Sequence, residues 1–132
     1  MPLRLKLKPQ ERVIIGGAAI QNGGARTEIF IENEVPVLRE QDILSPSAVR
    51  TPCQRVYLSL QLMYVEPARA AEHTALYRTL ADDVAEAAPS CRIVLDQISQ
   101  CAREGRLYQA LKHAKTLLAH EQEILTHVPN RA

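Results

Sequence analysis

The hydrophobic residues of this chain change their spacing once, near residue 45, and this change constrains the fold more than any other feature. Before residue 45 they alternate with polar residues, the period of two that places side chains on opposite faces of a β-strand. From about residue 51 they recur every three or four residues, as on an amphipathic helix. The sequence therefore predicts an α+β protein with a small β-rich unit at 1–45 and a helical unit at 46–132.

The first part predicts four or five short strands joined by tight turns. Residues 3–8 alternate three leucines with three cations, so that the leucines face a core and the cations face away from it. A β-branched run ends at Gly16-Gly17, as a strand that stops at a turn would. Residues 22–24, Asn-Gly-Gly, predict a further tight turn because these residue types tolerate positive φ.

The second part predicts a bundle of four helices. Thr51-Pro52 is typical of an N-cap followed by proline in the first helical position, and Ser90 is expected to cap the third helix. Gly105 is expected at the C-terminal cap of that helix. The residues expected on the inner faces are Val56, Tyr57, Leu60, Met63 and Tyr64, then Leu76, Leu80 and Val84, then Val94, Ile98 and Cys101, and finally Leu107, Leu111, Ala114, Leu118 and Leu125.

Overall charge and aromatic content argue against a broad nucleic-acid surface. The 16 Lys and Arg nearly balance the 15 Asp and Glu, for a net charge of +1. There is no Trp and only one Phe, Phe30, which argues against a sheet that stacks several bases on rings. Any such surface must come from a local arrangement of charge. Among residues 1–10 there are three cations and no acid.

The residues that could carry catalysis or hold a metal do not form a site. Three histidines, His113, His120 and His127, are seven residues apart, about 10 Å along a helix, too far to share one ion; we expect them to be exposed or to face a partner. Cys53 could be activated at a helix N-terminus, but a small buried hydrophobic residue is the favoured interpretation. We therefore predict no enzyme, no cofactor and no metal.

Cysteine number and hydropathy bear on the compartment. The three cysteines are odd in number and have no CxxC spacing, which argues against a disulfide framework. No long apolar run resembles a signal peptide or a membrane span. A cytoplasmic protein that does not engage a membrane is expected.

The cations of the first strand admit two interpretations. Arg4, Lys6 and Lys8 lie on one face, about 7 Å apart along the strand, a spacing close to that of phosphates along a nucleic-acid strand. A solvated face whose lysines protect a strand edge would have the same pattern.

Five blocks of sequence follow one another along nearly the whole chain: MPLRLKLKPQER at 1–12, IEN at 31–33, VLREQDIL at 37–44, TPCQRVY at 51–57 and QLMYVEP at 61–67. Together and in this order they resemble FlbT, a family of bacterial flagellar regulators. The resemblance implies post-transcriptional control of flagellin through binding to the 5′ untranslated region of flagellin mRNA, with repression by mRNA decay in some members and a positive effect in others.

Residues 3–44 contain a basic first strand, a turn with Glu11, a strand that ends at Ile15-Gly16, a glycine-rich hairpin, a further strand and Val-x-Arg-Glu at 37–40. This order is similar to that of CsrA, a small β protein that binds mRNA leaders. The resemblance implies an RNA-binding edge and a homodimer with interleaved strands, in which Arg39 approaches Arg4 and Lys6 of a partner chain. Glu40 and Asp42 are then expected to orient Arg39. The implied RNA-binding residues are Arg4, Lys6, Lys8, Val37, Leu38 and Arg39.

In the helical unit, residues 105–111 faintly resemble a helix-pair interaction motif of the tetratricopeptide type, but ordinary helix packing is the favoured interpretation. Two functions stay open. In the first, the protein binds the flagellin mRNA leader and controls its translation or decay, and the helices hold flagellin or another flagellar regulator. In the alternative, the protein is a chaperone or regulator that binds one of these proteins, and its effects on RNA are indirect.

Overall fold

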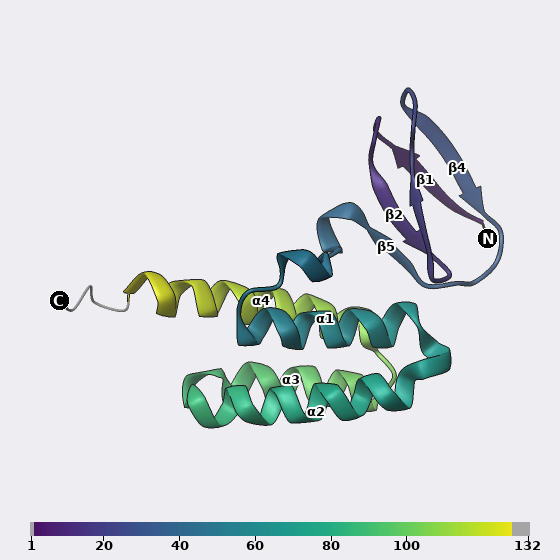
Figure 1. Ribbon diagram of the computed structural model, residues 1–132. Coiled ribbons are helices and arrows are strands. Elements are labelled where there is room, and N and C mark those ends of the chain that lie inside the picture. The colour runs from purple at the N-terminus through teal and green to yellow at the C-terminus, as the bar shows by residue number, and fades with distance from the viewer. Residues whose placement is uncertain (1, 128–132) are drawn as a thin grey trace. The chain divides into compact units, whose positions relative to one another are not determined.

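The computed structural model describes residues 2–127, in which five strands precede four α-helices (Figure 1). The predicted α+β class and the order of its parts are confirmed. The chain divides between Ile43 and Leu44 into two compact units, a β unit and a helical unit, which are described separately.

The strands of the β unit form two small antiparallel sheets. In one, β1 pairs with β4; in the other, β2 lies between β3 and β5. The strands are β1 (Leu3–Leu7), β2 (Arg12–Ile15), β3 (Ala18–Gln21), β4 (Thr27–Ile31) and β5 (Val37–Arg39). A short 3-10 turn, η1 (Glu40–Asp42), follows β5.

The core of the β unit comes from the alternation predicted for the first strand. Leu5 and Leu7 are buried together with Val13 of β2, while the residues between and after the two leucines are exposed. The partly buried residues that pack against this cluster come from β2, β4 and β5: Ile15, Ile29, Ile31 and Val37. Burial of these aliphatic side chains is the main force that holds the strands together.

The tight turn of the β unit lies at Gly16-Gly17, whose φ angles of 57° and 86° suit a two-residue hairpin between β2 and β3. The chain also turns at 22–24, but not by the expected geometry: Gly23 and Gly24 lack positive φ, and the Gly24 N–H donates to Asn22 Oδ1 at 3.2 Å. This turn does not form a hairpin, because β3 and β4 belong to different sheets. Asn22 instead ties this loop to the end of β1. Its side-chain amide donates to the carbonyls of Leu7, Lys8 and Ala25.

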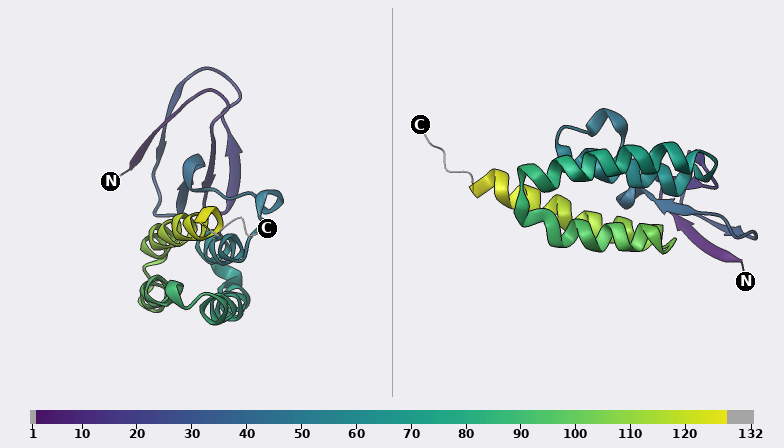
Figure 2. Two further views of the ribbon diagram at one scale, coloured as in Figure 1. Left: turned by 90° about the vertical axis from the view of Figure 1, so that its left-hand side faces the viewer. Right: turned by 90° about the horizontal axis from the view of Figure 1, so that it is seen from below.

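The helical unit is an arrangement of four helices that Figure 2 shows nearly end-on in its left view. Close contacts join α1 to α2, α1 to α4 and α3 to α4, whereas α2 and α3 touch least. The helices are α1 (Pro52–Val65), α2 (Ala70–Ala87), α3 (Arg92–Arg103) and α4 (Leu107–His127), with 3-10 turns η2 (Pro46–Ala48), η3 (Pro67–Arg69) and η4 (Pro89–Cys91). Over residues 2–127, none of the helices combines the length and apolarity that a membrane crossing requires.

Two of the three predicted helix caps are confirmed. Thr51 accepts from the Gln54 N–H and the Gln54 side chain accepts from Thr51 N–H, forming a capping box at α1. Gly105, at φ 76°, ends α3 in a Schellman motif. The cap expected from Ser90 is wrong. Ser90 lies within η4, and its hydroxyl pairs with the His120 ring instead.

The inner faces follow the predicted spacing in α1 and part of α3, but α2 is rotated from expectation. Leu76 is 46% exposed, whereas Tyr77 and Ala81 are buried. The Tyr77 hydroxyl reaches Ser99 of α3 at 2.7 Å, which gives this large ring a polar partner in the interior. Leu125 of α4 is also half-exposed, contrary to expectation, because Leu117 and Glu121 occupy the buried face there.

Candidate nucleic-acid interface

Arg4 and Lys6 of β1 and Lys8, which directly follows the strand, are exposed where Leu5 and Leu7 are buried, and we call these three cations the basic face. All three are exposed. Arg4 Nε lies 3.5 Å from Glu28 Oε2, but both side chains are open to water, so this ion pair restrains Arg4 weakly. Neither lysine has a carboxylate within 4 Å anywhere in residues 2–127. Two of the three cations are therefore available to a phosphate.

An aromatic ring stands beside the basic face. Phe30 of β4 lies directly opposite Arg4 in the β1–β4 register and is 58% exposed. Phe30 is not among the RNA-binding residues predicted from the sequence. The signal was present in the sequence: within the alternation of residues 27–31, Phe30 falls on the polar face, with Glu28, rather than with Ile29 and Ile31. An exposed ring among cations can stack a base.

Arg39 at the end of β5 lies against the backbone of β1. Its Nη2 donates to the Lys6 carbonyl at 2.8 Å and to Glu11 Oε2 at 2.8 Å, and its Nε donates to the same carboxylate oxygen at 3.3 Å. These contacts are made within one chain. The side chain remains 32% exposed, so the guanidinium adds part of its charge to the edge of the basic face.

Glu11, rather than Glu40, holds Arg39 in place. The expectation for Glu40 is wrong, because its carboxylate accepts the backbone N–H of Arg12 instead. Glu11 is 8% exposed and accepts the backbone N–H of Lys8 at 2.9 Å. This bond, followed by the bond from Arg39, lowers the pKa of the Glu11 carboxyl below its ordinary value of 4.5. Glu11 thus joins the end of β1 to Arg39 through one buried carboxylate.

We predict that Glu11→Gln lowers the free energy of unfolding of the β unit by about 1–2 kcal/mol at neutral pH, because a charged acceptor is lost. A carboxyl whose folded pKa is depressed stabilises the fold above its unfolded pKa, near 4.5, and this contribution disappears as pH falls through the folded pKa. The difference between wild type and variant should therefore shrink in acid.

The measurement is urea denaturation followed through the amide NMR signals of β1 and β2, at neutral pH and well below the ordinary Glu pKa. Glu32→Gln, an exposed change of the same kind, is the control. A difference that is the same at both pH values would contradict the role given to the Glu11 carboxylate.

The side chains of Val37 and Leu38, the other two implied site residues, pack in the β unit. Leu38 is fully buried, and Val37 packs against the core of the β unit. Strand β5 is nonetheless an edge strand of its sheet. Contact of residues 37 and 38 with a ligand would therefore run through the backbone, while Arg39 offers its side chain.

The described cysteines are buried, and the histidines singled out in the sequence lie in different surroundings. Cys53 is free and buried, and burial, reinforced by the nearby Glu121 carboxylate, raises the pKa of its thiol, so the favoured interpretation holds. His113 is half-buried, and His120 bonds within the chain to Ser90. The His127 side chain lies outside the described residues. Within the described part, no three His, Cys, Asp or Glu side chains are grouped so that they could hold a metal.

Comparison with known proteins shows the family of this chain. The model of the family described as "Flagellar protein FlbT" matches residues 3–125, which include both the basic face and the four helices. The chain belongs to the FlbT family. It is 41% identical over 125 residues, 94% of this chain and 85% of the relative, to the "Probable flagellum biosynthesis repressor protein FlbT 1" of Bradyrhizobium diazoefficiens.

More distant members of the family match just as completely. The "Probable flagellum biosynthesis repressor protein FlbT" of Rhodopseudomonas palustris is 39% identical over 126 residues, 96% of this chain and 99% of the relative. The "Flagellum biosynthesis repressor protein FlbT" of Caulobacter vibrioides is 32% identical over 130 residues, 97% and 92% of the two chains. No solved structure matches this chain. The resemblance to FlbT is confirmed, and it extends over both units.

Proposed function

We propose that this protein represses flagellum biosynthesis by binding the 5′ untranslated region of flagellin mRNA and controlling its translation or decay. The observation that carries the proposal is the basic face, with two unpaired lysines beside an exposed Phe30, in a chain of the FlbT family. Relatives in this family are named as repressors of flagellum biosynthesis, which favours a negative effect on the pathway.

The chemistry of the face suits single-stranded RNA. Lys6 and Lys8 supply point charges for successive phosphates, and Phe30 supplies a ring on which one unpaired base can stack. Arg39 is the contact that can read a base or hold a phosphate with two parallel hydrogen bonds, within the limits set by its bonds to Glu11. A duplex would hide its bases from Phe30, so a leader with an unpaired stretch is the favoured ligand.

The proposal places the protein in the cytoplasm, where mRNA is translated, and in a homodimer, as the pattern shared with CsrA implies. In a dimer each leader could contact two basic faces. Sedimentation of the purified protein with and without RNA measures the oligomeric state separately from RNA binding.

The test of function uses the purified full chain, freed of nucleic acid by nuclease, and a labelled flagellin leader. Saturable binding that an unrelated leader of equal length does not compete away supports the proposal. A companion protein that stays bound after nuclease treatment, together with no leader binding, would instead favour a chaperone or protein-binding regulator.

We predict that Phe30→Leu weakens leader binding about fivefold, because stacking of one base on a ring contributes about 1–3 kcal/mol and leucine keeps only part of the contact. Since Phe30 is 58% exposed, the fold should be unaffected. Fluorescence anisotropy measures the affinity, and Phe30→Tyr, which keeps a ring, should bind like wild type. Equal affinity of the leucine variant and wild type would remove Phe30 from the site.

A further inference from the structure

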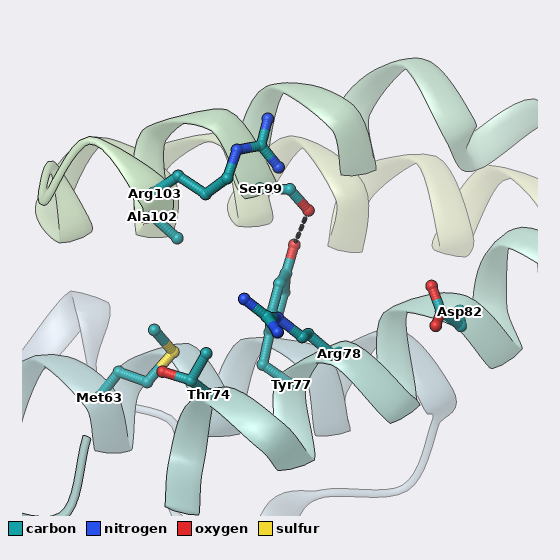
Figure 3. Close-up of a pocket in the computed structure, with 8 residues that line it drawn as sticks. All are labelled: Met63, Thr74, Tyr77, Arg78, Asp82, Ser99, Ala102 and Arg103. Atoms are coloured by element: carbon teal, nitrogen blue, oxygen red, sulfur yellow. Dashed lines mark hydrogen bonds between the residues drawn. The ribbon is translucent and has the colours of Figure 1, made fainter. Parts of the chain in front are cut away.

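The seam between α2 and α3 is where neighbouring helices of the bundle touch least, and it contains a pocket of about 320 Å³. The Tyr77–Ser99 hydrogen bond crosses the seam and forms part of the pocket's wall (Figure 3). This volume lies at the lower end of the range found for small-molecule sites in proteins. The lining residues come from α1, α2 and α3, all within the helical unit.

Two arginines from different helices line this pocket. Arg78 comes from α2 and Arg103 from the last turn of α3. In Figure 3 the Arg103 guanidinium lies on the Ser99 side of the Tyr77–Ser99 bond, and the Arg78 guanidinium extends across the Tyr77 ring. Among the residues described, neither arginine has a carboxylate within 4 Å. Asp82, on the same side of α2 as Arg78, lines the pocket without closing an ion pair with it.

The charge of Arg103 acts on the interior of the pocket. Burial raises the pKa of the Tyr77 hydroxyl, and the hydrogen bond with Ser99 and then the charge of Arg103 oppose this rise. Two like charges that share a cavity repel each other, so an arrangement of this kind gains stability when an anion enters. Both arginines are exposed, so neither neutralises a buried carboxylate of the helical unit.

The other lining groups define what kind of anion fits. Met63 and Ala102 offer an apolar surface, and Thr74 also lines the pocket. Asp82 would accept from a hydroxyl or amine. Guanidinium groups hold phosphate and carboxylate oxygens with paired hydrogen bonds, and phosphate, with its higher charge, satisfies two of them at once.

We propose that the α2–α3 pocket binds a small phosphomonoester, whose phosphate lies between Arg78 and Arg103 and whose organic part rests on Met63 and Ala102. The site is separate from the basic face, on a different unit of the chain. It gives the helical unit a small-molecule ligand in addition to any protein partner, and thereby a means by which a metabolite can act on this regulator.

The experiment follows the amide NMR signals of the full, isotope-labelled chain during titration with phenyl phosphate. Separate titrations with inorganic phosphate and with phenol test the phosphate and the ring of this probe alone. Saturable shifts at Tyr77, Ser99 and Arg103, tighter for phenyl phosphate than for inorganic phosphate and absent with phenol, are the expected result. The double variant Arg78→Gln/Arg103→Gln should bind phenyl phosphate at least about tenfold more weakly.

Arg55→Gln/Arg92→Gln, which removes two exposed cations outside the pocket, is the matched control and should bind like wild type. Equal loss in both double variants would overturn the proposal, as would shifts confined to Arg4, Lys6 and Lys8 or no saturable shift at millimolar ligand. Because the measurement uses no RNA, its failure leaves the proposed regulatory function untouched, and failure of leader binding leaves this result untouched.

Discussion

Replacing both Lys6 and Lys8 with alanine is expected to weaken binding of the flagellin leader about ten- to a hundredfold, or about 1.5–3 kcal/mol, because two phosphate contacts are lost. The two lysines are exposed and have no carboxylate within 4 Å over residues 2–127. Lys6 lies on the face of β1 that the core does not use, and Lys8 directly follows the strand. Folding should therefore survive the change. Fluorescence anisotropy at fixed ionic strength measures the effect.

The matched control for this variant is Arg55→Ala/Arg92→Ala, which removes the same charge from exposed positions of α1 and α3. It should bind the leader almost like wild type, since its charges are not part of the face. If both double variants lose affinity equally, net charge rather than the basic face governs binding. These lysines are a sharper test than Arg39, whose loss would also leave the buried Glu11 carboxylate without its partner.

Leu5→Ala is expected to lower the free energy of unfolding of the β unit by about 2–5 kcal/mol, the range for large-to-small changes in a packed core. Leu5 lies between Arg4 and Lys6 in β1, is 4% exposed and packs with Leu7 and Val13. Its side chain contacts no ligand in our account, so any loss of RNA affinity should follow the loss of folded β unit.

This prediction is checked by urea denaturation and by leader binding at a temperature where the variant is folded. Leu5→Met, which keeps nearly all of the volume, should cost much less stability, below about 1.5 kcal/mol. Leu5→Ala tests the buried face of the first strand, and Lys6→Ala/Lys8→Ala tests the cations exposed on the other side. Full stability in Leu5→Ala would contradict the core described here.

The fold was largely predictable because its parts have clear periods. Alternation in residues 3–7 specifies which side of β1 is buried, and Thr51 with Pro52 marks the start of α1 through local chemistry alone. The orientation of α2 was not predictable from spacing, because Leu76 and Tyr77 fit equally regular stripes. The choice between them depends on Ser99, a partner for the Tyr77 hydroxyl that lies 22 residues away.

The candidate site was predictable only where it follows from strand geometry. Arg4, Lys6 and Lys8 share a face because alternate residues of any strand do. The bonds from Arg39 to Glu11 and to the Lys6 carbonyl depend on tertiary packing, as residues 28 and 33 positions apart must meet. Phe30 was visible in the sequence, but its place opposite Arg4 required the β1–β4 register.

The central claim is that a few cations on one small face bind the flagellin leader, and the salt dependence of that binding tests it most directly. With two to four phosphate contacts per chain, the slope of log affinity against log salt concentration should lie at about −1.4 to −2.8 for single-stranded RNA. Lys6→Ala/Lys8→Ala should make that slope shallower by about 1.4. Absence of saturable leader binding, or a steep slope that the double variant does not change, would contradict the account.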